Sequence, residues 1–480
     1  MSVDEPAAIV FIVVDALRAR NLSCYGYRKP TSPNIDRLAK GGVLFENAFC
    51  CSNTTDPSIT SIFSGLYPIS HAIVNHGTQV QAEELRAFSR RAITLLPERL
   101  KSRGYVTLAV DCMGRWHNKG YDYYYDYYQA PEGDRSPSMK KTVADRIHTL
   151  PTFLQARLRN LYNVFKPESD INAESITDTA IDLMRANRGE PFFLYIHYWD
   201  VHFPYPCKRS YYKQMYDGPG GERLSEVVRQ LSDPEWRQHI HRFTSRFKTT
   251  NEIMAKYNGA IAFVDAQIGR LSAALQREGI LHRTLLLVTS DHGESLTEHG
   301  IYFDHHGLYD ETIHVPLILT YPPSLPRNRR MSALVQHVDL VPTIFDLIDG
   351  NAGATFDGRS LAPLVQGSVE SPRSAIYAEE TWVQGKRAIR TKRYKYIQAV
   401  SEAAAVCRYC GCIHGGLEEL YDLRADPLEL TNILDQRPRV AEALREHMSD
   451  CVEHLQRNAF DREKAVVARM IGGLKTRGRF

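Results

Sequence analysis

The sequence predicts an α/β fold, a sandwich with a mostly parallel central sheet flanked by helices, followed by a small C-terminal α+β subdomain. Continuous runs of β-branched and other apolar residues recur along the chain, which is typical of strands buried on both faces of a parallel sheet. Helical patterns lie between them, for example at residues 34–42 and 173–189. This alternation indicates a sheet covered by helices. With 480 residues, the chain is long enough for one large domain and a smaller one.

Five apolar runs are the predicted core strands. They are residues 8–15 ("AIVFIVVD"), 105–111 ("YVTLAVD"), 191–200 ("PFFLYIHYWD"), 284–293 ("TLLLVTSDHG") and 315–322 ("VPLILTYP"). Several of them carry acidic or histidine residues at or just past their C-terminal ends: Asp15, Asp111, Asp200 and the pair Asp291–His292. Because ligands bind beyond the carboxyl ends of strands in open α/β sheets, we expect the functional site at this edge.

Two further segments depart from the strand–helix alternation. Residues 129–170 are polar and basic, so we expect them to form an insertion over the core. After about residue 370 the chain changes to an alternating strand pair within residues 385–400 and then to a long helical tail. We therefore predict a large α/β domain at residues 1–370, which carries the expected functional site, and a small C-terminal subdomain at residues 371–480.

Composition limits the classes of partner. Hydrophobic content of 43%, charged content of 24% and a net charge of +3 are ordinary for a globular protein and give no reason to expect a nucleic acid. No apolar run approaches the roughly 20 residues that span a bilayer, so we expect no membrane partner. The acidic N-terminus does not resemble a signal peptide, and nine cysteines without a secreted framework agree with a cytoplasmic location. A homo-oligomer remains open.

The strand-end residues predict a metal site. A carboxylate and an imidazole side by side, Asp291 and His292, suit a divalent ion of borderline hardness, and Asp15 can supply a third ligand. Thr55 begins the helical stretch "TDPSITSIFSGLYP". Its oxygen would be the fourth ligand, and metal binding would make it a usable nucleophile. The alternative is that Thr55 is only a helix cap.

Eight motifs in order resemble the sulfatase branch of the alkaline phosphatase superfamily over nearly the whole chain. They are "VVDALRARNLSCYGYRKPTSPNIDRLAKGG", "TDPSITSIFSGLYP", "FFLYIHYWDVHFPY", "SDHGESLTEHG", "LYDETIHVPLIL", "VDLVPTIFDL", "DGRSLAPLVQG" and "LYDLRADPLELTN". The resemblance implies an alkaline-phosphatase-like α/β sandwich and a divalent metal beside the nucleophile. It also implies hydrolysis or transfer of a sulfate, phosphate or phosphonate ester.

The nucleophile motif departs from that of the sulfatases proper. Their motif is Cys-X-Pro-X-Arg (or Ser for the Cys), and its first residue is oxidised to formylglycine. Here Thr55 stands in the first position and Ile59 replaces the arginine. The last ligand is His292, where the family often has Asn. This set is similar to that of the phosphonate monoester hydrolases and of the phosphoethanolamine transferases, which use an unmodified threonine. It favours Mn or Zn over Ca, and Mg remains open.

The way in which the ester of the nucleophile must be broken down favours some substrate classes over others. A formylglycine hydrate can expel sulfate by collapsing to an aldehyde, whereas a threonine ester must be attacked at its central atom by water or an acceptor alcohol. Phosphoryl and phosphonyl esters of threonine tolerate such a second displacement on a metal. We therefore predict a metal-dependent hydrolase of a small anionic ester that favours phosphate or phosphonate. The alternatives are a sulfatase proper, a phospho-group transferase and a catalytically degenerate anion-binding relative.

The resemblance also suggests residues that bind or protonate the ester. His202 matches the histidine that family members direct at the substrate, and His305 or His306 occupies the place where many relatives have a lysine. We prefer His305 for the catalytic role, as a general acid, and keep His306 as substrate-binding. Arg115 and His117 in "MGRWHNKG" resemble the family's Lys-Trp-His segment and would bind the anion. For both, a packing role is the alternative.

A cysteine cluster lies outside these motifs. Its members are Cys407, Cys410, Cys412 and His414, within "CRYCGCIH". This spacing could hold a structural Zn, and the alternative is a loop of ordinary thiols.

Overall fold

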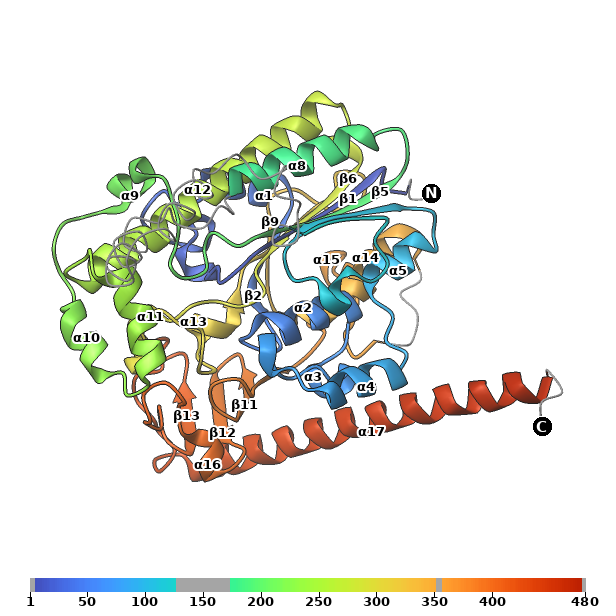
Figure 1. Cartoon of the computed structure of the whole chain (residues 1–480). Helices are drawn as coiled ribbons and strands as arrows, with labels where there is room; N and C mark the ends of the chain where they lie inside the picture. The colour runs from blue at the N-terminus through green and yellow to red at the C-terminus, as the bar shows by residue number, and fades with distance from the viewer. Residues whose placement is uncertain (1–4, 127–172, 351–355, 477–480) are drawn as a thin grey trace, which may run out of the picture.

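The computed structural model describes residues 5–126, 173–350 and 356–476 (Figure 1). Within these residues the core is a nine-stranded sheet in the order β4-β3-β5-β1-β6-β8-β2-β7, with β9 paired to β2. The strands are β1 (Ala8–Val14), β2 (Val43–Phe49), β3 (Val106–Asp111), β4 (Tyr123–Asp126), β5 (Phe192–Tyr198), β6 (Thr284–Thr289), β7 (His314–Val315), β8 (Leu317–Thr320) and β9 (Arg329–Gln336). All five predicted runs form strands, and the insertion predicted at 129–170 lies outside the described residues.

The centre of the sheet is parallel, which confirms the predicted fold class. Strand β1 pairs in parallel with β5 and β6, and β3 pairs in parallel with β4 and β5. Strand β8 runs antiparallel to β6 and to β2. The apolar run at 315–322 is split between β7 and β8 at Pro316, because proline has no N–H to donate to a strand ladder.

Strand β1 is apolar throughout because both of its faces are buried. Alternate residues such as Ile12 pack in one apolar cluster with helices α1 (Pro33–Gly41), α8 (Ala173–Ala186) and α12 (Thr250–Arg277). The intervening residues such as Phe11 pack with helices α2 (Thr55–Ser64), α5 (Leu96–Lys101) and α14 (Leu340–Asp349). Figure 1 shows these two helix layers on opposite sides of the sheet.

The remaining helices lie around this core and along the chain's last quarter. They are α3 (Pro68–His71), α4 (Ala82–Arg90), α9 (Arg209–Met215), α10 (Leu224–Gln230), α11 (Pro234–Thr244), α13 (Asp310–Ile313), α15 (Ala362–Val365), α16 (Glu402–Ala405) and α17 (Pro438–Thr476). Among the described residues, none of the helices combines the length and hydropathy needed to cross a membrane.

A second, four-stranded antiparallel sheet follows the main one. Its strands are β10 (Ala375–Glu380), β11 (Lys386–Thr391), β12 (Tyr394–Ala399) and β13 (Glu418–Asp422), in that order. One face packs with β2 and β9 through an apolar cluster that includes Phe49 and Leu334. The other face packs under helix α17, which then runs past α3 and α4 (Figure 1). The small sheet thus lies next to the segment that leads from β2 into α2.

Candidate active site

The predicted metal ligands meet at the carboxyl edge of the main sheet. Asp15 directly follows β1, and Asp291 and His292 follow the neighbouring parallel strand β6. Thr55 is the first residue of helix α2. Because β1 and β6 are adjacent and parallel, their ends bring the two aspartates together.

The four side chains form one buried group, each at most 1% exposed. The Thr55 Oγ1 lies 3.2 Å from His292 Nε2, which is 3.3 Å from Asp291 Oδ2 and 3.7 Å from Asp15 Oδ1. Both carboxylate oxygens of Asp15, and Oδ2 of Asp291, are buried without a hydrogen-bond partner. Buried carboxylates need a compensating charge, so this set of oxygen and nitrogen donors fits a divalent cation.

The ligand atoms are oriented by the backbone around them. The Nδ1–H of His292 donates to the carbonyl of Gly293 at 2.8 Å, which leaves the Nε2 lone pair directed at Thr55 and the aspartates. Burial lowers the pKa of His292 to about 4, so the imidazole is neutral, as a metal ligand must be. The Oδ1 of Asp291 accepts from the N–H groups of Ala16 and His292, leaving Oδ2 free.

The two carboxylates repel each other. Burial raises the pKa of Asp291 to about 7, and the charge of Asp15 adds to the shift. Burial also acts to raise the pKa of Asp15, but neighbouring histidines, His202 first among them, outweigh it and hold this pKa well below its usual range. A divalent cation between the carboxylates would favour the ionised form of both, because its charge outweighs their repulsion.

His197 is a residue of the site that the sequence prediction missed. His197 lies within β5, fully buried, with Nδ1 at 2.9 Å from Asp111 Oδ1 and Nε2 at 3.6 Å from Asp15 Oδ2. Burial opposes its protonation, but the two carboxylates raise the pKa of His197 to about 10. This imidazolium therefore connects Asp15 to Asp111. The signal that could have found it is a histidine inside an otherwise apolar strand.

Arg115 and His117 converge on Asp56, the residue that follows Thr55. His117 Nε2 lies 3.0 Å from Asp56 Oδ1, and Arg115 forms an ion pair with the same oxygen. His76, also not singled out from the sequence, lies 3.0 Å from the other oxygen. Burial acts to raise the pKa of Asp56, but the hydrogen bonds with His117 and His76 hold it well below its usual range. The two predicted anion-binding residues thus contact the first turn of α2.

Of the three remaining predicted histidines, two lie at the predicted metal site and one lies beside a cysteine. The ring of His305 is 4.2 Å from that of His292 and 5.7 Å from that of His202, and its Nδ1–H donates to the Asn53 carbonyl at 2.6 Å. The structure therefore brings His202 and His305 to the predicted metal site. His306 instead places Nε2 at 3.7 Å from the sulfur of Cys407.

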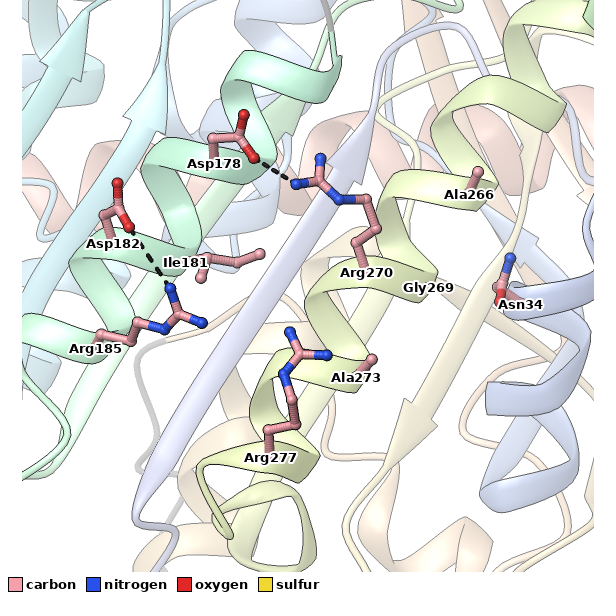
Figure 2. Close-up of a pocket in the computed structure, with 10 residues that line it drawn as sticks. All are labelled: Asn34, Asp178, Ile181, Asp182, Arg185, Ala266, Gly269, Arg270, Ala273 and Arg277. Carbon is pink, nitrogen blue, oxygen red and sulfur yellow. Dashed lines mark hydrogen bonds and ion pairs between the residues drawn. The ribbon is translucent and has the colours of Figure 1, made fainter.

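A cavity of about 740 Å³ lies elsewhere, between helices α8 and α12 (Figure 2). The ion pairs Arg270–Asp178, at 2.6 Å, and Arg185–Asp182, at 4.0 Å, lie on its walls. None of the predicted site residues lines it. Its paired, exposed charges contribute little binding energy, so we place no function there.

Two protein-family models match this chain. The model described as Sulfatase matches residues 7–350, and the model described as N-sulphoglucosamine sulphohydrolase, C-terminal, matches residues 297–458. A protein of Formosa agariphila named Sulfatase is 26% identical over 454 residues, which cover 90% of this chain and 83% of that protein.

Two solved structures share the fold. A protein solved in complex with its substrate D-glucosamine-2-N,6-O-disulfate has a TM-score of 0.69 at 21% identity, covering 95% of this chain and 99% of its own. The phosphonate monoester hydrolase of Agrobacterium radiobacter has a TM-score of 0.68 at 20% identity, covering 94% and 96%. These matches confirm the fold and the resemblance that the motifs indicated. The chain therefore belongs to the Sulfatase family of ester hydrolases, within the alkaline phosphatase superfamily.

Proposed function

We propose that this chain hydrolyses a phosphate or phosphonate ester, with the Thr55 hydroxyl as nucleophile beside one divalent metal ion. The observation that carries the proposal is the position of Thr55 Oγ1, 3.2 Å from His292 Nε2 and among unpartnered carboxylate oxygens. A helix cap would instead accept a hydrogen bond from the backbone of its own helix. Thr55 is the first helical residue, and the N-cap residue Thr54 makes no side-chain cap bond.

Asp15, Asp291, His292 and Thr55 would hold the metal ion. A bound divalent cation supplies two effects here: it lowers the pKa of the Thr55 hydroxyl and neutralises charge on the ester. The oxygen-rich set with one imidazole favours Mn or Zn over Ca, with Mg as a further candidate.

Thr55 would react as the alkoxide, its hydroxyl proton having passed to solvent water, and the first displacement forms the bond between Thr55 Oγ1 and phosphorus as the bond to the leaving oxygen breaks. The leaving oxygen takes a proton from Nε2 of His202. We assign this proton to His202 instead of His305, the general acid expected from the sequence, because the ring of His202 is partly exposed and can exchange protons with water. His305 is 8% exposed, and burial lowers the pKa of His305 to about 3, so its neutral ring orients the ester.

The second displacement releases the product. Water gives a proton to His202 Nε2 and attacks phosphorus, and the bond from phosphorus to Thr55 Oγ1 breaks, which returns Thr55 as the alkoxide for the next turnover. Arg115 and His117 would act on the anion from the first turn of α2, where Asp56 holds them. A sulfate ester of threonine lacks the aldehyde route that formylglycine offers, so we rank phosphorus above sulfur.

A second candidate is sulfate-ester hydrolysis. It is favoured by the family model and by the protein of Formosa agariphila, which is named a sulfatase. The replacement of the motif cysteine by Thr55 and of its arginine by the fully buried Ile59 argues against it.

Substrate and metal panels test the proposal together. Purified protein is stripped of metal, reloaded with Mn, Zn, Mg or Ca, and assayed on an aryl sulfate, an aryl phosphate, an aryl phosphodiester and an aryl phosphonate. We expect activity that requires metal and is highest on a phosphorus ester. Higher activity on the sulfate would overturn the ranking. No activity on any of the four esters with any of the metals would favour a degenerate anion-binding relative.

The cellular location is also a proposal. The nine cysteines all lie in the described residues and none of them forms a disulfide, and Cys50 and Cys51 are fully buried. Cysteines stay out of disulfides in a reducing compartment, which supports the cytoplasm.

A further inference from the structure

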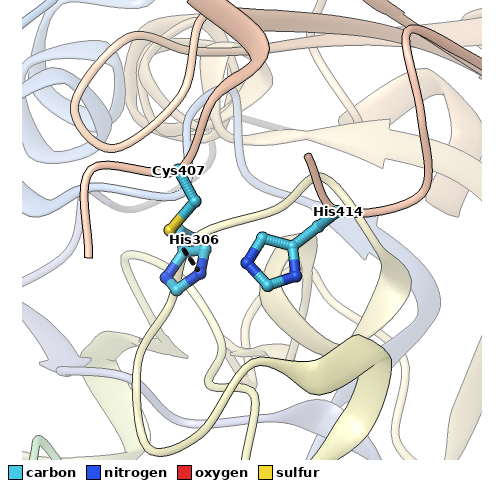
Figure 3. Close-up of side chains that lie close together, drawn as sticks. All are labelled: His306, Cys407 and His414. Atoms are coloured by element: carbon cyan, nitrogen blue, oxygen red, sulfur yellow. Dashed lines mark hydrogen bonds between the residues drawn. The ribbon is translucent and has the colours of Figure 1, made fainter. Parts of the chain in front are cut away.

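A second cluster of metal-binding side chains lies beside the active site. It joins His306, from the loop after β6, to Cys407 and His414, from the loop between β12 and β13 (Figure 3). All three residues are buried, at 4%, 1% and 9% exposure. Each offers one ligand atom, and these atoms lie within 4.8 Å of one another.

The distances suit a tetrahedral ion. Zn–S bonds of about 2.3 Å and Zn–N bonds of about 2.0–2.1 Å place neighbouring sulfur and nitrogen ligands about 3.6 Å apart. The Cys407 sulfur is 3.7 Å from His306 Nε2. The Cys410 sulfur is 3.2 Å from His414 Nε2, which makes Cys410 the fourth candidate ligand.

Both imidazoles are oriented as ligating histidines are. The Nδ1–H of His414 donates to the His299 carbonyl at 3.1 Å, and Nδ1 of His306 lies 3.3 Å from the Asp304 carboxylate. In each ring Nε2 is the atom that faces a cysteine. A second partner that fixes the tautomer in this way is typical of metal-bound histidine.

The backbone of the loop presents two thiols from one tight turn. The N–H of Gly411 donates to the Cys407 carbonyl, and the N–H of Cys407 donates to the Cys412 carbonyl, both at 2.8 Å. Gly411 has a φ of +70°, which favours glycine at this position of the turn. Cys412 is exposed and its thiol donates to the Cys410 carbonyl, so we leave it out of the ligand set.

We propose that His306, Cys407, Cys410 and His414 bind one structural Zn²⁺. The ligand set differs from the sequence prediction, since His306 replaces Cys412 and is assigned to the ion instead of the substrate. The ion would fasten the loop between β12 and β13 to the segment that carries His305. Because the His305 ring contacts His292, the ion would also fix one wall of the active site. The proposal does not depend on the ester class or on the catalytic metal.

Metal content and thiol-specific spectroscopy test this site separately from the catalytic one. We expect Cys407→Ser and Cys410→Ser to lower the bound zinc by about one equivalent per chain relative to wild type. Cys412→Ser, in the same turn, is the matched control and should leave zinc content unchanged. Cobalt-loaded wild type should show a thiolate-to-cobalt charge-transfer band that Cys407→Ser removes, since the four predicted catalytic ligands include no thiol.

A measurement on wild type covers the case in which a variant fails to fold. Alkylation of stripped and zinc-loaded protein is followed by peptide mass spectrometry, with Cys412 as the internal reference. We expect zinc to protect Cys410 at least tenfold and Cys412 not at all. Equal alkylation of Cys410 with and without zinc, wild-type zinc content in Cys407→Ser, or loss of zinc in Cys412→Ser would each overturn the proposed ligand set.

Discussion

Replacing Asp200 with asparagine should change how stability depends on pH. Asp200 follows β5 and is 1% exposed, with Oδ1 accepting the first N–H of helix α8, from Ala173, at 2.9 Å. Its Oδ2 is buried without a partner. Burial raises the pKa of Asp200 from 3.8 to about 7, so the folded state holds a proton that the unfolded state releases.

The raised pKa of Asp200 sets the direction and the size of the change in folding stability with pH. A raised folded-state pKa contributes stability that is fully present below about pH 4 and is lost as pH rises through about 7. At about 1.4 kcal/mol per pH unit, the loss is about 4 kcal/mol over the whole window and about 3 kcal/mol from pH 5 upward. An entropy of unfolding of about 2.1 cal/mol/K per residue gives about 1 kcal/mol per degree for this chain, so 3 kcal/mol corresponds to about 3 °C.

Thermal unfolding at pH 5 and pH 8 is the assay. Asparagine cannot ionise and keeps the acceptor for Ala173, so the Tm of Asp200→Asn minus that of wild type should rise by about 3 °C between the two pH values. Any constant effect of the buried amide cancels in this comparison. Asp182→Asn, an exposed change on helix α8, is the control and should show no such rise. A difference that stays constant within about 1 °C would show that Asp200 is ionised in the folded protein.

Three further predictions concern the surroundings of Thr55. Asp56→Asn removes the buried charge shared by Arg115, His117 and His76, and should cost about 3–5 kcal/mol, read as a Tm lower by about 3–5 °C. A wild-type Tm would contradict the central role of Asp56. His197→Gln should weaken metal binding about 10–100-fold in a chelator competition, because Asp15 loses its buried partner. Unchanged affinity would remove His197 from the site. Ile59→Arg, which restores the family arginine, should destabilise the protein by several kcal/mol, because Ile59 is fully buried among Phe11 and Phe63. A stable variant with increased sulfate-ester turnover would contradict this.

Regular burial made much of the fold predictable. Strand β1 is buried on both faces, so its residues are apolar without interruption and stand out in the sequence. Asp15 and the pair Asp291–His292 were predictable as a group because neighbouring parallel strands end at one edge. The antiparallel pairing of β8 was not predictable, since a short apolar run carries no sign of its direction.

The parts that escaped prediction depend on contacts between distant segments. His197 is a functional candidate only because Asp111 and Asp15 flank it in space. His306 and Cys407 are 101 residues apart, and no local pattern joins them. The spacing of the cysteines indicated a metal but could not show that Cys412 is exposed while Cys407 is buried.

The kcat of Thr55→Ala on the best phosphorus ester, compared with that of Thr55→Ser, tests the central claim most directly. Because alanine has no oxygen to attack phosphorus while Asp15, Asp291 and His292 still bind metal, we predict a loss of at least about 10⁴-fold in Thr55→Ala with metal content retained. Thr55→Ser, which keeps the hydroxyl, should retain measurable turnover. Activity of metal-loaded Thr55→Ala within about tenfold of wild type would contradict the assignment of Thr55 as the nucleophile.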